Sequence, residues 1–293
     1  MTIERRVRTG DGRLLAVTED GAASGEALFM LYGTPAGRTL APVQAEDAAA
    51  RGIRLLSYDR PGYGKSTARA GRTVADASAD VRAIADALGI DRFYVAGMSG
   101  GGPHALAAAA LLPDRVRAAA TLGGVAPFGA EGLDWLDGMG EENHAEFAAT
   151  RAGRPALFRY LLPHRVGILS LPASSIGDEM RTLLSAVDRE VLTDDFAEYL
   201  SASMKSALMF GLAGWLDDDL AFVAPWGFDL ASLRVPVSVW HGAEDRFVPE
   251  RHGRWLAAHV PGAEARILPG EGHLSLLARR SGEVHAWLAA HAR

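Results

Sequence analysis

Short apolar runs alternate with amphipathic stretches along the first part of the chain. The apolar runs predict strands at 13–20, 27–33, 53–59, 93–97 and 116–124. The stretches between them predict helices at 41–52, 73–89 and 104–112, and in the second of these the apolar residues recur at helical spacing. Apolar strands that alternate with helices usually form a parallel sheet buried on both faces. We therefore expect an α/β fold with a mostly parallel sheet flanked by helices.

The alternation stops near residue 127. Between 127 and 225 no strand-like run occurs, and helical stretches there are rich in aromatic residues and methionine. The alternation resumes with a strand at 235–242, a helix near 249–259, a strand at 265–270 and a final helix from about 274 to 291. We therefore expect a core domain made of 1–126 and 226–293, with an inserted helical cap at 127–225.

The composition narrows the class of protein. The 293 residues, 48% of them apolar, suffice for a large globular domain with an insertion. The formal net charge of −6, with acids and bases interspersed, does not fit a nucleic-acid-binding protein. The chain has no cysteine, no apolar run of membrane-spanning length and no secretory signal pattern in its first residues. We expect a cytoplasmic protein with no nucleic-acid partner, no membrane partner and no bound metal.

One serine stands in a special context. The pentapeptide GMSGG at 97–101 matches the pattern G-x-S-x-G and lies between a predicted strand and a predicted helix. A sharp strand-to-helix corner gives the serine an unfavourable backbone conformation and brings the residues two before and two after it together. Gly97 and Gly101 remove the side chains that would collide there. We predict that Ser99 is a nucleophile, held beside a helix N-terminus that favours negative charge.

A nucleophilic serine needs a base, and the base needs an acid that orients it. Among the nine histidines, His273 follows the last predicted strand and begins a helix, so it should point to the same sheet edge as Ser99. The loop after the strand at 235–242 contains Glu244 and Asp245. We predict Asp245 as the acid, with Glu244 as the alternative. The order serine, aspartate, histidine along the chain is that of one fold family.

Five short motifs carry a resemblance to that family. They are LYGTP (31–35), DRPGYGKS (59–66), GMSGG (97–101), HGAEDRFVP (241–249) and GEGHL (270–274). In this order they resemble the motifs of α/β-hydrolase fold enzymes with an inserted cap, and the details are similar to cap-bearing serine esterases and proline-iminopeptidase-like hydrolases. The resemblance spans nearly the whole chain.

The resemblance also implies an oxyanion hole. The family usually has His-Gly-x-Pro after the third strand, whereas this chain has Tyr32 in the place of the histidine. The donors implied by the family are the backbone N–H groups of Thr34 and Gly100. Because backbone donors survive a change of side chain, we expect the hole to persist; the exchange bears on what supports the loop.

Taken together, these residues predict a serine hydrolase that cleaves a small carboxylic ester, lactone or thioester through an acyl-enzyme, without a cofactor. Two alternatives stay open. An aminopeptidase of the proline-iminopeptidase type would need acids in the cap to hold a free amine, and Glu141, Glu142 and Glu198 are candidates. A non-catalytic, ligand-binding member of the fold is the other. The sequence does not predict the oligomeric state or the natural substrate.

Two further polar groups have structural interpretations. Asp59, in the loop at 59–66, is expected to accept hydrogen bonds from turn backbone and to take no part in the chemistry. The run Asp217-Asp218-Asp219 is expected to form a solvated edge of the cap, because contiguous carboxylates do not converge on one cation without further ligands.

Overall fold

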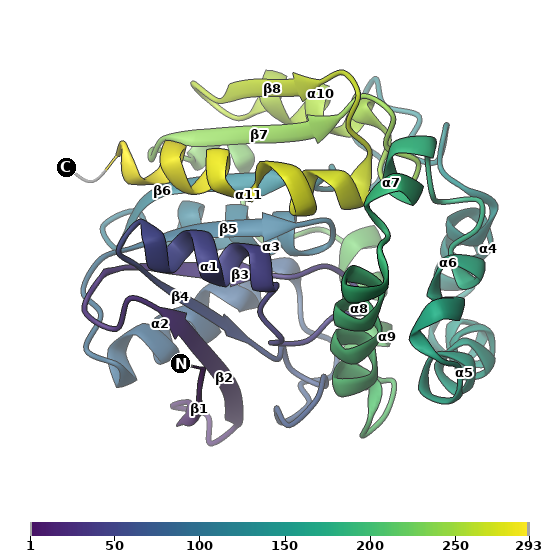
Figure 1. The fold of residues 1–293 in the computed structure, drawn as a ribbon, viewed down its shortest axis with the longest axis horizontal. Coiled ribbons are helices and arrows are strands. Elements are labelled where there is room, and N and C mark those ends of the chain that lie inside the picture. Colours follow the sequence, from purple (N-terminus) through teal and green to yellow (C-terminus); the bar gives the residue numbers. More distant parts are fainter. Residues whose placement is uncertain (1, 292–293) are drawn as a thin grey trace.

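A computed structural model describes residues 2–291, and its centre is one mixed sheet (Figure 1). The strands are β1 (Ile3–Arg8), β2 (Leu14–Gly21), β3 (Glu26–Leu31), β4 (Ile53–Tyr58), β5 (Phe93–Met98), β6 (Val116–Leu122), β7 (Val237–Gly242) and β8 (Glu264–Leu268). They lie in the order β1-β2-β4-β3-β5-β6-β7-β8. Strand β2 pairs antiparallel with β1 and β4, and every pair from β4 through β8 is parallel. The predicted fold class is confirmed.

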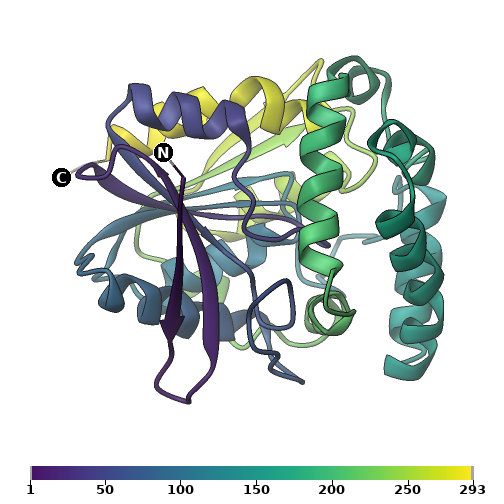
Figure 2. The same cartoon turned by 60° about the horizontal axis from the view of Figure 1, so that its bottom comes forward.

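Helices cover both faces of this sheet. On one side are α1 (Pro42–Ala50) and α11 (His273–Ala289); on the other are α2 (Ala77–Ala87), α3 (Gly101–Leu111) and α10 (Glu250–His259), as the two views show (Figures 1 and 2). Successive residues of β3 therefore belong to different apolar cores. Leu28 and Met30 pack toward α1 and α11, whereas Phe29 and Leu31 pack toward α2 and α3. Burial of both faces explains the continuous apolar runs.

The sequence patterns missed strand β1 and misplaced one helix start. In β1 the side chain of Val7 is buried while its neighbours are mostly exposed, so the strand has no apolar run. It is held by antiparallel pairing with β2 along its whole length. Helix α3 begins at Gly101, three residues before the predicted start at 104, because the glycines that mark the corner also form the first helical turn.

Six α-helices lie between β6 and β7 in the sequence. They are α4 (Glu141–Arg151), α5 (Arg154–Ser170), α6 (Ile176–Glu179), α7 (Ala186–Val191), α8 (Asp194–Leu208) and α9 (Ala213–Val223). We call them the inserted helices. Figure 1 shows them to the right of the sheet, on the side toward which the arrowheads of β5 and β7 point. Among residues 2–291, no helix has the length and apolar character needed to span a bilayer.

Candidate active site

Ser99 occupies the strained corner between β5 and α3. Its φ is +52°, and it is the one non-glycine residue with positive φ in the described part of the chain. A Cβ at Gly97 would lie 2.2 Å from the carbonyl oxygen of Gly101, and a Cβ at Gly101 would lie 1.9 Å from that of Leu31. Both glycines are therefore required by close backbone packing. The strain at such a residue costs about 1–3 kcal/mol, which the surrounding sheet and helix must offset.

His273 and Asp245 meet at the same end of the sheet. His273 is the first residue of α11, and its Nδ1 lies 2.6 Å from Asp245 Oδ2 in the turn after β7. The other oxygen of Asp245 accepts the backbone N–H groups of Phe247 at 2.9 Å and Val248 at 2.8 Å. Asp245 is buried and fixed by these bonds, whereas Glu244 is exposed. The structure thus brings Asp245, and not Glu244, to the histidine.

The environment of His273 favours its charged form. Burial disfavours the imidazolium, but the charge and hydrogen bond of Asp245, with a further contribution from the charge of Asp188, outweigh it. The pKa of His273 is therefore raised above its usual value. The ring of Phe247 stacks on the imidazole at a centroid distance of 4.6 Å and limits how it can turn.

Ser99 and His273 line one small cavity. Its volume is about 90 Å³. Most of the lining is apolar, and it comes from both the sheet edge and the inserted helices: Met98, Met180, Tyr199, Leu200, Met204, Phe247, Leu274 and Leu277. The hydroxyl-bearing Ser99 and the imidazole-bearing His273 therefore border the same, mostly apolar space. The assignment of Ser99, Asp245 and His273 as nucleophile, acid and base stays a prediction.

The two predicted oxyanion donors lie beside Ser99. A Cβ at Gly33 would lie 2.9 Å from the Cβ of Ser99, and a Cβ at Gly100 would lie 2.8 Å from Thr34 Oγ1. The loop with Thr34 therefore faces the start of α3 across Ser99. Within residues 2–291, neither the Thr34 nor the Gly100 N–H has a hydrogen-bond partner in the protein. Both N–H groups remain available to an oxygen atom bound at Ser99.

Asp218 overturns the expectation of a solvated edge. All three aspartates of the run at 217–219 are buried, with at most 2% exposure. Asp218 Oδ2 lies 2.5 Å from Arg60 Nη2, and Oδ1 lies 2.6 Å from Arg72 Nη2. Burial opposes ionisation, yet these two guanidinium groups hold the pKa of Asp218 well below its usual range. The sequence pattern could not show this, because the partners lie more than 140 positions away.

This buried ion cluster supports the loop of the predicted oxyanion hole. Asp218 Oδ2 accepts the hydroxyl of Thr34 at 2.8 Å and that of Tyr63 at 2.9 Å. Arg60 donates to the backbone oxygens of Tyr32 and Gly33. The cluster therefore holds both the side chain of Thr34 and the backbone that precedes it.

Tyr32 holds the same loop from the other side. Its hydroxyl donates to Gln44 Oε1 at 2.6 Å and accepts the backbone N–H of Ala41 at 2.8 Å. The exchange of histidine for tyrosine thus leaves the loop well supported. The histidine next to this region, His104, faces Asp218 at 3.3 Å, and burial lowers the pKa of its imidazole.

Comparisons with known proteins agree with this architecture. Residues 26–155 match the family described as alpha/beta hydrolase fold. A 2-hydroxy-6-oxononadienedioate/2-hydroxy-6-oxononatrienedioate hydrolase of Cupriavidus pinatubonensis is 27% identical over 91% of this chain and 87% of its own length. A 2-hydroxy-6-oxo-6-phenylhexa-2,4-dienoate hydrolase of Burkholderia cepacia is 29% identical over 86% and 82%. The solved structure of a thermophilic esterase from Thermogutta terrifontis superposes with a TM-score of 0.72 at 20% identity, covering 99% of both chains.

The chain has the α/β-hydrolase fold, and residues 26–155 match the family model of that fold. The family model ends within α5, but the named relatives and the solved structure extend across the inserted helices to the last strands. The resemblance drawn from the five motifs is thereby confirmed, and the chain is a hydrolase.

Acidic side chains from two of the inserted helices also line the hydrolase's site. Glu146 of α4 and Asp219 of α9 line a cavity of about 70 Å³ that also reaches Ser99. The indole N–H of Trp215 donates to Glu146 Oε1 at 2.6 Å. Burial raises the pKa of Glu146 and, together with the neighbouring Glu146, raises the pKa of Asp219 well above its usual range. The two carboxyl groups are also hydrogen-bonded to each other, which favours a proton held between them.

The other acids expected to matter fall into two groups. Glu142 lines a neighbouring cavity of about 120 Å³, whereas Glu141 and Glu198 are exposed. Asp59 is buried and accepts the backbone N–H groups of Arg38 and Lys65, so its expected structural role is confirmed.

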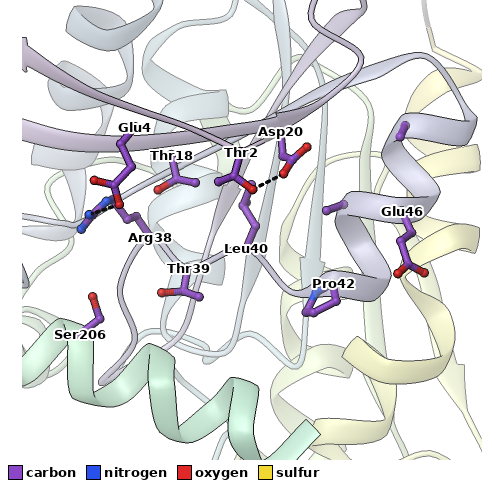
Figure 3. A pocket seen from close by; sticks show the side chains of 12 residues that line it. Thr2, Glu4, Thr18, Asp20, Arg38, Thr39, Leu40, Pro42, Glu46 and Ser206 are labelled. Atoms are coloured by element: carbon purple, nitrogen blue, oxygen red, sulfur yellow. Dashed lines mark hydrogen bonds and ion pairs between the residues drawn. The ribbon is translucent and has the colours of Figure 1, made fainter. Parts of the chain in front are cut away.

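A larger hollow of about 540 Å³ lies away from this chemistry (Figure 3). It is open, both polar and apolar side chains line it, and neither Ser99 nor His273 is among them. The guanidinium of Arg38, which borders it, is already bound to Glu4 at 2.8 Å and to Asp59 at 2.6 Å. Its size reflects an open surface groove between β1, β2 and α1, and we place no catalytic step there.

Proposed function

We propose that this hydrolase is a serine hydrolase that cleaves a small carboxylic ester, lactone or thioester through an acyl-enzyme on Ser99. The observation that carries the proposal is a single arrangement. Ser99 stands on a strained strand-to-helix corner, in one apolar cavity with His273, whose Nδ1 is bound to the buried Asp245 at 2.6 Å.

The proposed reaction has two halves. In the first, Ser99 Oγ attacks the substrate carbonyl while His273 Nε2 takes the hydroxyl proton, and the same imidazole then protonates the departing alcohol or thiol. The N–H groups of Thr34 and Gly100 bind the oxygen as it becomes negative. In the second half, water transfers a proton to His273 and attacks the acyl group, which leaves as the acid and restores the hydroxyl of Ser99.

The inserted helices support this proposal as a cap. Met180 of the segment between α6 and α7, and Met204 of α8, line the cavity with Ser99. The helices therefore close the carboxyl edge of the sheet and keep water from the reacting groups.

The charge of the site bears on the substrate. No arginine or lysine lines the cavity with Ser99 and His273 or the two cavities with Glu146, as far as residues 2–291 show. The name of the Cupriavidus relative specifies a dioate, which is a doubly negative substrate. Glu142 and the pair Glu146–Asp219 would repel such a molecule. The acyl and leaving groups proposed for this chain are therefore uncharged.

One observation favours a second candidate. Glu142 and Glu146 border the same cavity of about 120 Å³, next to Thr34 of the predicted oxyanion hole. A free amine held there would be stabilised by negative charge, as an aminopeptidase of the proline-iminopeptidase type requires. The two candidates share Ser99 and differ in whether the substrate carries a cation.

The test begins with covalent labelling. A fluorophosphonate probe should modify Ser99, located by mass spectrometry of the digested protein, and should not modify the Ser99→Ala variant. Labelling at no residue, or at another serine, would refute the proposed nucleophile and favour a ligand-binding member of the fold.

Turnover then separates the substrate classes. We expect the highest kcat/KM for uncharged p-nitrophenyl esters of short acids, lower values for prolyl arylamides, and the lowest for a 2-hydroxy-6-oxo-dienedioate. A preference for the arylamide would establish the aminopeptidase alternative. A preference for the dioate would contradict the electrostatic argument and place this chain with its curated relatives.

A further inference from the structure

Asp188 reaches from the inserted helices to the start of helix α11. It lies in α7, is fully buried, and accepts the first three backbone N–H groups of α11. The donors are His273 at 3.1 Å, Leu274 at 2.8 Å and Ser275 at 3.0 Å. The hydroxyl of Ser185 donates to the same carboxylate at 2.8 Å. One carboxylate thus satisfies groups that a helix start leaves without partners.

The carboxylate of Asp188 caps two helices that lie far apart in the sequence. Ser185 and Asp188 form a capping box for α7 itself, so the carboxylate serves its own helix and a second helix 85 positions later. Gly272 makes the approach feasible, because a Cβ there would lie 2.3 Å from Asp188 Oδ2. A substitution at either position would therefore move the backbone at His273.

Building on the proposed function, we propose that Asp188 is a positioning residue that holds His273 in place and stabilises its charged state. It touches no reacting atom. It fixes the main chain from which the imidazole projects, and its negative charge offsets the positive end of the α11 dipole beside that ring. Because Asp188 belongs to the inserted segment, the position of helix α7 is coupled to the position and the charge state of His273.

Few charged or titratable groups surround the imidazole of His273. The charged or titratable groups around His273 are Asp245 from the turn after β7, Asp188 from α7 and His241 from β7. Burial lowers the pKa of His241 and so favours its neutral form, and its Nε2 donates to the carbonyl of Val248. Glu271 precedes the helix, but it is bound to Arg280 at 2.7 Å. Asp245 and Asp188 are thus the two anions that face the imidazole.

The test compares Asp188→Asn with Glu190→Gln. Glu190 is the matched control because it also joins α7 to α11, through an exposed ion pair with Arg279 at 3.1 Å, away from the start of the helix. For Asp188→Asn we expect kcat on a p-nitrophenyl ester to fall roughly tenfold to hundredfold, as a displaced base requires. We expect KM to change little. The acid limb of kcat/KM should move to lower pH. Glu190→Gln should keep the parent kcat and pH profile.

A direct titration keeps this test separate from the proposed function. NMR titration of the His273 imidazole needs no turnover, and in Asp188→Asn its midpoint should move to lower pH than in the parent. An unchanged midpoint with parent kcat, even with lower thermal stability, would reduce Asp188 to a structural cap and overturn the inference. A parent protein that shows no fluorophosphonate labelling would instead refute the proposed function while leaving the NMR comparison valid.

A second variant covers the case in which Asp188→Asn does not fold. Gly272→Ala keeps the carboxylate but pushes it away from the start of α11, because the added Cβ would lie 2.3 Å from Asp188 Oδ2 and 2.4 Å from Ser185 Oγ. We expect this variant to lower kcat at nearly unchanged KM. Parent-like kcat in Gly272→Ala would contradict the positioning role.

Discussion

The strand ends of the core and the inserted helices serve the candidate site in different ways. The core carries the groups proposed to react: Ser99 after β5, Asp245 after β7 and His273 at the start of α11. The inserted helices carry Asp218 and Asp188, which contact no proposed reacting atom. Those two carboxylates bind the loop of the predicted oxyanion hole and the backbone of the predicted base.

The groups proposed to react therefore belong to the core, and the carboxylates that hold the surrounding backbone belong to the inserted helices. The core groups need only short-range geometry at one sheet edge, which the parallel strands provide together. The supporting carboxylates are buried and act over long sequence distances, so each ties the inserted helices to the core. Substitutions in the core should therefore change activity at nearly constant stability, and substitutions of the supporting carboxylates should change stability as well.

The largest expected effect tests the core. Ser99→Ala should lower kcat on the order of 10⁶-fold, the loss typical of a missing serine nucleophile. The midpoint of thermal unfolding should change little, because alanine keeps the Cβ and therefore the same strained backbone at the corner. Ser203→Ala is a matched control, because Ser203 is buried in the same cavity and its hydroxyl has no partner in the described chain. Loss of activity in the control but not in Ser99→Ala would reverse the assignment.

The next effect separates two neighbouring carboxylates. Asp245→Asn should lower kcat by roughly 10⁴-fold, because the amide favours the wrong tautomer of His273. Glu244→Gln should stay close to the parent, since Glu244 is exposed. Steady-state kinetics on one ester suffices. Equal losses in the two variants would show that the turn itself, and not the Asp245 carboxylate, is being disturbed.

The same contrast explains what could be predicted from the sequence. Strands β2 to β8, the corner at Ser99 and the histidine after β8 were predictable because each depends on residues that are close in sequence. Glycine spacing, apolar runs and strand ends are local signals. From these signals we predicted the sheet and the placement of Asp245 and His273 at one of its edges. In the structure His273 Nδ1 lies 2.6 Å from Asp245 Oδ2.

The contributions of the inserted helices could not be predicted in that way. Asp218 was expected at a solvated edge of the cap because contiguous carboxylates do not converge on one cation without further ligands. Its burial depends on Arg60 and Arg72, which precede it by more than 140 positions. Asp188 carries no local signal for α11 either, since the pattern Ser185-x-x-Asp188 predicts only the start of α7.

Asp218 provides the third test. Asp218→Asn should lower the free energy of unfolding by about 3–5 kcal/mol, because Arg60 and Arg72 would stay buried without their anion. Asp217→Asn is the control: Asp217 pairs with Arg154, whose side chain is 42% exposed and can reach water when the bond is lost. Chemical denaturation of both variants measures the difference. If Asp218→Asn lost activity at parent stability, Asp218 would belong with the reacting groups.

The smallest effect is the pH dependence of the parent enzyme, to which both regions contribute. Asp245 from the core and Asp188 from the inserted helices raise the pKa of His273 against the opposing effect of burial. The base must be neutral to accept the Ser99 proton. A raised pKa of His273 therefore moves the midpoint of the acid limb of kcat/KM above about 6.5, the pKa of an ordinary histidine. Below that limb kcat/KM should fall about tenfold per pH unit. We expect kcat/KM to rise between roughly pH 6 and 8. The pH profile should be the same with and without EDTA. A flat profile across this window would remove His273 from the role of base, and a loss on chelation that a divalent metal restores would replace the mechanism with a metal-assisted one.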